Sequence, residues 1–121
     1  MRVNDIKELF DVLINMKIFK NIKFWKNSIE ISPYKNLTIK VVETTYFDIY
    51  FNNFFYYSFE NEEILDFINE LTHGKYVIIE KIDKKNNSSI DIVSTKKFTQ
   101  NIQKYLTQSN IKIYSFKKQI K

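Results

Sequence analysis

The sequence contains no cysteine, and it has only one glycine, one proline and one histidine among its 121 residues. Without cysteine the chain can form neither a disulfide framework nor a thiolate metal site, and it cannot hold a Cys–His dyad. A single glycine excludes a glycine-rich phosphate loop, and a single histidine excludes a cluster of histidine metal ligands. The sequence therefore predicts no enzyme of the familiar kinds, no metal site and no cofactor.

Long apolar runs are also lacking. No stretch approaches the roughly 18 apolar residues that a membrane span needs. The first residues lead into an amphipathic pattern, with Asp5, Glu8 and Asp11, instead of the apolar core of a signal peptide. Because a chain without cysteine also suits a reducing compartment, we expect a soluble protein of the cytoplasm with no membrane partner.

The middle of the chain lacks positive charge. Residues 41–74 contain none of the 19 Lys and Arg residues, yet they hold ten of the twenty Phe, Tyr and Trp residues. This block carries seven acids and hence a net charge of −7, whereas residues 1–40 carry +4 and residues 75–121 carry +8. Solubility alone favours interspersed signs. This separation of negative from positive charge therefore indicates a surface that binds a partner.

Apolar spacing predicts the secondary structure. At 44% hydrophobic, the chain is large enough for one domain with its own core, so we expect a single domain over residues 1–121. Three- and four-residue spacing predicts helices, and alternation predicts strands. The predicted helices are Asp5 to about Met16, capped by Asn4, then Glu62–Thr72, and Lys96 to about Gln108. The predicted strands are Ser28–Ser32, Leu37–Glu43, Tyr46–Asn52, optionally Phe54–Ser58, Tyr76–Ile82, Ile90–Ser94 and Ile111–Phe116.

The resulting order is α-β-β-β-(β)-α-β-β-α-β, with mostly short links between consecutive strands. This order predicts an α+β fold with a largely antiparallel sheet and about three helices. The only glycine, Gly74, falls where a left-handed cap would end the second helix.

The candidate binding residues lie in the acidic middle block, which has no Lys or Arg. In the predicted meander Tyr46, Asp48 and Tyr50 share the side of their strand opposite Phe47, Ile49 and Phe51, and acids follow on the next helix. Any single tyrosine is better explained by packing beneath a helix with only its hydroxyl exposed, and each acid could simply be solvated. The predicted partner-binding set is Tyr46, Asp48, Tyr50, Tyr56, Tyr57, Glu60, Glu62, Glu63, Asp66 and Glu70.

Two basic segments, residues 17–40 and 96–121, support an alternative function as a small nucleic-acid-binding protein. In the first segment Phe24 and Trp25 are interpreted as core residues, with base stacking beside lysines as the rival role. In the second, Lys97, Asn101, Lys104 and Gln108 share one side of the predicted helix, followed by Lys112, Lys117, Lys118 and Lys121. All the positive charge of these two segments is Lys, which lacks the bidentate phosphate contacts of Arg.

Two further features support a third, minor hypothesis that the protein is an enzyme. Asp83-Lys84-Lys85 follows an apolar strand and superficially matches half of a metal-dependent nuclease site, but a second carboxylate cannot be chosen from the sequence. We interpret it as a solvated loop tip. His73 precedes Gly74 in the last turn of a helix, where a cation eases the helix dipole, and we interpret it as structural.

Taken together, a small α+β chain that is rich in Lys, Asn and Ile and has an aromatic, acidic patch resembles the immunity proteins of bacterial contact-dependent growth inhibition and related polymorphic toxin systems. The resemblance is one of composition and covers the chain without any matched motif. It implies an inhibitor that binds a cognate toxin domain, often a basic nuclease, with acids standing in for nucleic-acid phosphates. Many such inhibitors are acidic overall, whereas this chain is +5. The sequence does not indicate an oligomeric state.

Overall fold

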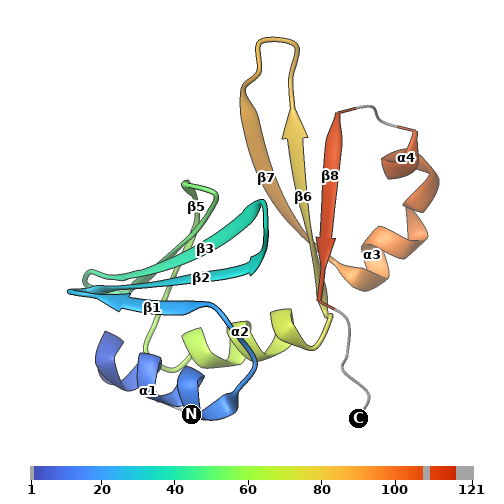
Figure 1. Cartoon of the computed structure of the whole chain (residues 1–121). Helices are drawn as coiled ribbons and strands as arrows, with labels where there is room; N and C mark the ends of the chain where they lie inside the picture. The colour runs from blue at the N-terminus through green and yellow to red at the C-terminus, as the bar shows by residue number, and fades with distance from the viewer. Residues whose placement is uncertain (1, 108–109, 117–121) are drawn as a thin grey trace. The chain divides into compact units, whose positions relative to one another are not determined.

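The structure, a computed structural model, describes residues 2–107 and 110–116 (Figure 1). Its contacts divide the chain into two compact units, Met1–Phe67 and Ile68–Lys121. The division falls inside the helix α2, so this element belongs to both. One domain over residues 1–121 stays a prediction.

The first unit is a five-stranded antiparallel meander in the order β1-β2-β3-β4-β5. Consecutive strands are neighbours, so each link is a short turn. Before the sheet comes one helix, and after it the chain enters α2. The elements are α1 (Ile6–Met16), β1 (Ile22–Trp25), β2 (Ser28–Tyr34), β3 (Leu37–Glu43), β4 (Phe47–Phe51), β5 (Phe54–Phe59) and α2 (Ile64–Thr72).

One face of this sheet is the core of the first unit. Because side chains alternate along a strand, every second residue of the central strands points the same way. Those residues are all at most 3% exposed: Ile29, Ile31, Leu37, Ile39, Val41, Phe47, Ile49 and Phe51. The paired register places them in cross-strand rows such as Ile29, Val41 and Ile49. We call this side of the sheet the core face and the opposite side the outer face.

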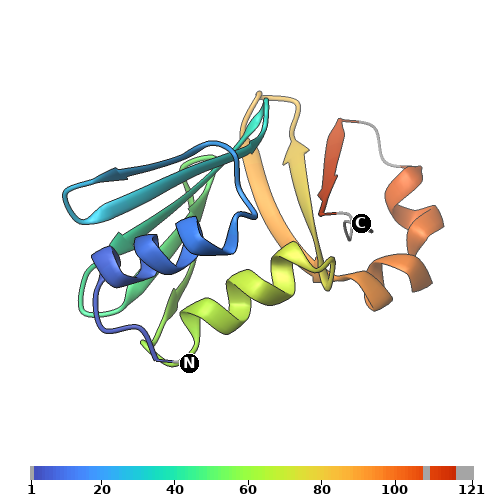
Figure 2. The same cartoon turned by 60° about the horizontal axis from the view of Figure 1, so that its bottom comes forward.

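The helix α1 covers the core face (Figures 1 and 2). Leu9 and Leu13 are buried, and the ring of Phe10 lies 5.2 Å from that of Phe24 on β1. Asp5 caps the helix by accepting the backbone N–H of Glu8 at 2.8 Å. The predicted cap, Asn4, was therefore wrong by one residue. Asn and Asp are both common N-cap residues, so the sequence alone does not decide between Asn4 and Asp5.

The edge strand β5 contains a bulge. Ile49 pairs with Tyr57 whereas Tyr50 pairs with Phe55, so Tyr56 is an extra residue opposite β4. Such a bulge places two successive side chains on one side of the strand. Phe55 consequently lies on the outer face beside Tyr50, and Tyr56 lies on the core face, where its ring is 5.6 Å from that of Phe67.

The helix α2 ends as the glycine predicts. Gly74 has φ +81°, and its N–H donates to the carbonyl of Leu71 while the N–H of Lys75 donates to the carbonyl of Glu70. These two bonds form a Schellman motif, which satisfies carbonyls that the helix leaves unpaired.

The second unit contains a three-stranded antiparallel sheet in the order β7-β6-β8. Its elements after α2 are β6 (Tyr76–Ile82), β7 (Ser88–Ser94), α3 (Thr95–Gln100), α4 (Ile102–Leu106) and β8 (Ile111–Ser115). Val77, Ile78 and Ile79 of the central strand form its buried centre. Glu80 is also buried and accepts the hydroxyl of Tyr114 at 3.4 Å. Burial, then the nearby Glu80 carboxylate, raise the pKa of Tyr114.

Two sequence predictions need correction. Residues 22–25 form the strand β1, which was not predicted because this segment was interpreted by its basic composition. The third predicted helix is two short helices, because the chain breaks at Asn101, whose side chain donates to the carbonyl of Lys97 at 2.9 Å. Such a side-chain bond to the preceding turn competes with helical pairing. Gln108, Lys117, Lys118 and Lys121 lie outside the described residues.

The α+β class with antiparallel sheets is confirmed: the described chain has eight strands in two antiparallel sheets and four helices. Leu37–Glu43, predicted from alternation, and Tyr76–Ile82, predicted from a β-rich apolar run, both have the predicted bounds. Among the described residues, no helix is both long and apolar enough to cross a membrane.

Gly74→Ala tests the cap. A Cβ at this position would lie 2.9 Å from the carbonyl oxygen of Phe116, and the positive φ disfavours any side chain. We expect a loss of about 1 kcal/mol or more of unfolding free energy in urea titration. Asn15→Ala, at an exposed position of α1, is the control and should leave stability unchanged or slightly higher. Equal stability of Gly74→Ala and wild type would contradict the assigned cap.

Candidate functional site

The outer face of the five-stranded sheet carries large aromatic side chains that water reaches. Trp25 is 70% exposed and Phe55 57%. Tyr50 is half-buried and meets Phe55 edge to face, with ring centroids 5.6 Å apart. Tyr46, 45% exposed, precedes β4 on the same alternation as Asp48 and Tyr50. Neighbouring strands are about 4.8 Å apart, so Trp25 on β1 and Phe55 on β5 are separated by about 19 Å across the sheet.

Charges of both signs lie between these aromatics. Lys23, Glu30 and Lys40 occupy directly paired positions on β1, β2 and β3, and the row continues to Tyr50 and Phe55. The adjacent row runs through Trp25, Ser28, Val42, Asp48 and Ser58. Both helices that pack on this sheet lie on the other side, as the rings of Phe24 and Tyr56 show. We call these two rows, together with Tyr46, the outer-face surface.

Trp25 is not a core residue, and that interpretation of the sequence was wrong. It ends β1 and directly precedes the two-residue turn Lys26-Asn27, where Lys26 adopts a positive φ of 53°. The ammonium of Lys26 lies 5.7 Å from the centre of the indole ring. Phe24 points to the opposite side, against Phe10, as a core residue should. The alternation of Ile22-Lys23-Phe24-Trp25 could have predicted that Phe24 and Trp25 lie on opposite sides of a strand, with only Phe24 in the core.

The structure divides the four predicted tyrosines between the two sides of the sheet. Tyr46 and Tyr50 belong to the outer-face surface. Tyr56 packs among the rings of Phe51, Phe59 and Phe67, with centroids 5.6 to 6.3 Å away. Burial, and secondarily Tyr57, raise the pKa of Tyr56. Tyr57 lies on the core side of the edge strand but is 52% exposed.

Most acids of the negative block have partners within the chain. Asp48 accepts the hydroxyl of Ser58 at 2.5 Å and that of Thr44 at 3.3 Å. Glu43 accepts the backbone N–H of Ile6 at 2.5 Å, at the start of α1. A carboxylate is favourable there, since the first amides of a helix have no partner within it.

The acids that begin α2 follow the same pattern. Glu62 forms an exposed ion pair with Arg2. Glu63 accepts the backbone N–H of Glu60 at 3.1 Å. Further along, Glu70 accepts the hydroxyl of Tyr76 at 3.1 Å. Glu60 and Asp66 are exposed. An acidic surface along α2 is therefore weaker than the net charge of −7 predicts, because Arg2, 60 residues away, offsets part of it.

In the first unit the basic residues Lys23, Lys26 and Lys40 accompany the aromatics of the outer-face surface. In the second unit, Lys97 and Lys104 lie on different short helices, because the chain breaks at Asn101. Their predicted common helical face is therefore interrupted. Lys112 lies on β8, in register with Glu80.

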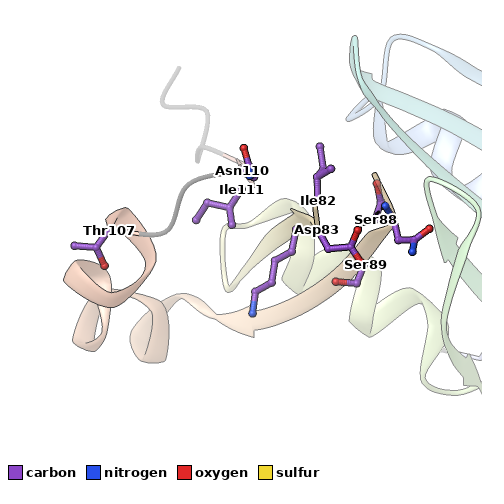
Figure 3. A pocket seen from close by; sticks show the side chains of 9 residues that line it. Ile82, Asp83, Ser88, Ser89, Thr107, Asn110 and Ile111 are labelled. Atoms are coloured by element: carbon purple, nitrogen blue, oxygen red, sulfur yellow. Dashed lines mark hydrogen bonds between the residues drawn. The ribbon is translucent and has the colours of Figure 1, made fainter. Parts of the chain in front are cut away.

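The second unit has an open hollow of about 600 Å³ at one end of its sheet (Figure 3). Its lining residues are Lys81, Ile82, Asp83, Asn87, Ser88, Ser89, Thr107, Asn110 and Ile111. Asp83 is the only carboxylate among them. One of its oxygens accepts the backbone N–H groups of Lys85 and Asn87, both at 2.8 Å, and so closes the loop between β6 and β7. This is the loop-forming role that Asp commonly takes in turns.

Within the described part of the chain, the structure places neither Asp83 nor His73 in a cluster of side chains that could hold a metal ion. Across residues 2–107 and 110–116, no three His, Cys, Asp or Glu side chains gather in a way that could hold a metal ion. His73 is exposed, and its Nδ1 lies 2.6 Å from the carbonyl oxygen of Asn69 one turn earlier. Its contact is thus with its own helix.

No protein-family model, curated protein or solved structure matches this chain.

The exposure of Trp25 predicts how two aromatic substitutions differ. Trp25→Ser should change the unfolding free energy by no more than about 0.5 kcal/mol, since an exposed side chain contributes little. Phe51→Ala, in the core face of the same unit, should cost about 3 to 5 kcal/mol. Urea unfolding followed by circular dichroism measures both. A large loss in Trp25→Ser would place this residue in a core.

The bonding of Asp83 predicts no metal-dependent nuclease activity. Purified protein incubated with DNA or RNA and Mg²⁺ or Mn²⁺ should cleave neither, because Asp83 has no neighbouring carboxylate in the hollow. Cleavage that disappears in Asp83→Ala and persists in Asp91→Ala would contradict this prediction.

Proposed function

We propose that this protein is a cytoplasmic binding protein without catalytic activity of its own, and that it binds and neutralises a bacterial toxin domain as immunity proteins do. The observation that carries a binding role is the outer-face surface. Trp and Tyr are the side chains that most often dominate the energy of protein interfaces, because they bury a large area at a small entropic cost. Here Trp25, Phe55 and Tyr46 are 45 to 70% exposed on one side of one sheet.

The charges of this surface favour a protein partner. Lys23, Glu30 and Lys40 alternate in sign along one row of paired residues, and Asp48 lies in the adjacent row. Interspersed charges fix orientation and exclude wrong partners, whereas a surface that tracks phosphates is positive throughout. The rigid sheet also presents these groups in a fixed arrangement, which lowers the entropy lost on binding.

The proposed surface overlaps with the predicted partner-binding set at Tyr46, Asp48 and Tyr50. The remaining members stay candidates for a second contact region. The exposed ones are Tyr57, Glu60, Glu62, Glu63 and Asp66, whereas Tyr56 and Glu70 are half-buried. A basic toxin domain could be steered by these acids before it docks on the aromatics, since long-range charge acts mainly on the association rate.

A second candidate function is single-stranded nucleic-acid binding at the same surface. It is favoured by Lys26, whose ammonium lies 5.7 Å from the Trp25 ring centre, and by the presence of Lys23 and Lys40 on the same face. Stacking of bases on aromatics beside such lysines is a common mode of binding to single strands.

The proposal predicts that a neighbouring gene encodes a toxin domain, and the test uses that domain as the partner. Co-expression should protect cells from this domain, and calorimetry should measure a complex. Trp25→Ala and Tyr50→Ala should each weaken the complex by about tenfold or more, which is the range of interface hot spots. Asp66→Lys should mainly slow association, and Lys104→Glu is the matched control on the other unit.

The outcomes separate the alternatives. Binding that is lost in Asp66→Lys and unchanged in Trp25→Ala would move the interface to α2. Absence of both protection and binding would refute the immunity function. Fluorescence polarisation with mixed single-stranded oligonucleotides near 150 mM salt, roughly physiological, should detect only weak binding. Tight binding there that is lost in Lys23→Glu and Lys40→Glu would establish the nucleic-acid function instead.

A further inference from the structure

The strand β5 differs from every other edge strand in the two described sheets. Sheet edges are β1 and β5 in the first unit, and β7 and β8 in the second. An edge strand exposes unpaired backbone groups, and proteins usually protect it with a charged side chain. β1 has Lys23, β7 has Asp91 and β8 has Lys112. β5, with the sequence Phe-Phe-Tyr-Tyr-Ser-Phe, has no charge.

The side chains of β5 are exposed on both sides of the strand. Phe55, on the outer face, is 57% exposed, while Phe54 and Tyr57 on the other side are 37% and 52% exposed. Within the described residues β5 pairs with β4 alone. Of the features that usually protect an edge, β5 has a bulge at Tyr56. An uncharged aromatic edge of this kind is a template for pairing with another strand.

We propose that the occupant of this edge is a second copy of the chain, which adds its own β5 in antiparallel orientation. A twofold axis between two copies sets each β5 against itself, running in opposite directions. Like charges that face each other across such a pair are destabilising. Of the four edges, β5 is the one where self-pairing opposes no charge.

The pairing has a consequence for the outer-face surface. Directly opposed residues of an antiparallel pair point to the same side of the sheet. The dimer therefore contains one continuous sheet of ten strands, within the usual range for open sheets. Its two outer faces lie on the same side, and its two α1 helices lie on the other. The dimer rests on β5 alone and does not depend on the identity of any partner.

Light scattering coupled to size-exclusion chromatography tests the proposal on the full chain over a concentration series from micromolar to near-millimolar. Wild type should be a dimer at the upper end. Tyr57→Lys, which supplies the missing charge, should be a monomer with an unchanged circular dichroism spectrum. Tyr46→Lys introduces the same charge at a tyrosine of similar exposure outside β5, and it should remain a dimer.

A monomeric wild type at all concentrations would overturn the proposal, as would a Tyr57→Lys variant that remains dimeric. A dimer that is lost in Trp25→Ser would place the interface on the outer face and would also overturn it. Because the chain has no cysteine, Tyr57→Cys and Tyr46→Cys provide a second test that does not need the Lys variant to fold. Mild oxidation should link Tyr57→Cys into dimers several times more efficiently than Tyr46→Cys. Equal yields would contradict the β5 interface.

Discussion

The two-residue alternation of the five-stranded meander is the constraint on which the candidate site depends. Ile39, Val41 and their paired neighbours must all lie on the core face, since a shift by one residue would turn every apolar side chain of a strand into water. The same alternation fixes what lies opposite. Asp48 and Tyr50 therefore point away from the core because Phe47, Ile49 and Phe51 point into it. The outer-face surface is thus determined by the hydrophobic core behind it.

Exposed aromatics on a rigid sheet are the feature that separates binding from a merely solvated surface. A protein of this size needs Lys, Glu and Ser on its outer face to stay in solution, and Lys23, Glu30 and Ser28 serve that end. Trp25 and Phe55 do not serve that end, and most of each side chain is exposed. The acids, in contrast, are largely accounted for by the fold: Glu43 serves α1, Asp48 bonds Ser58 and Glu70 bonds Tyr76.

The sequence predicted the elements that depend on local signals and missed those that depend on distant ones. Alternation identified β3, an apolar β-rich run identified β6, and Gly74 identified the end of α2, because each signal lies in its own element or directly after it. The strand β1 is an exception: its alternation of Ile22 and Phe24 with Lys23 and Trp25 is a local signal, but it was missed because the segment was interpreted by its lysines. The Arg2–Glu62 pair joins residues 60 positions apart, and the bulge that turns Tyr56 into the core is specified by the pairing of β5 with β4. Neither the Arg2–Glu62 pair nor the bulge is visible in a short-range pattern of the sequence.

The outer face of the free protein exposes aromatic side chains. Trp25 reports on this face directly because it is the only tryptophan in the chain. Its fluorescence in dilute protein should resemble that of an indole in water, with a red emission maximum, and both acrylamide and iodide should quench it efficiently. Docking of a partner on this face should shift the emission to the blue and protect it from both quenchers. A blue, protected emission from the free protein would contradict the account, because Trp25 would then already be covered.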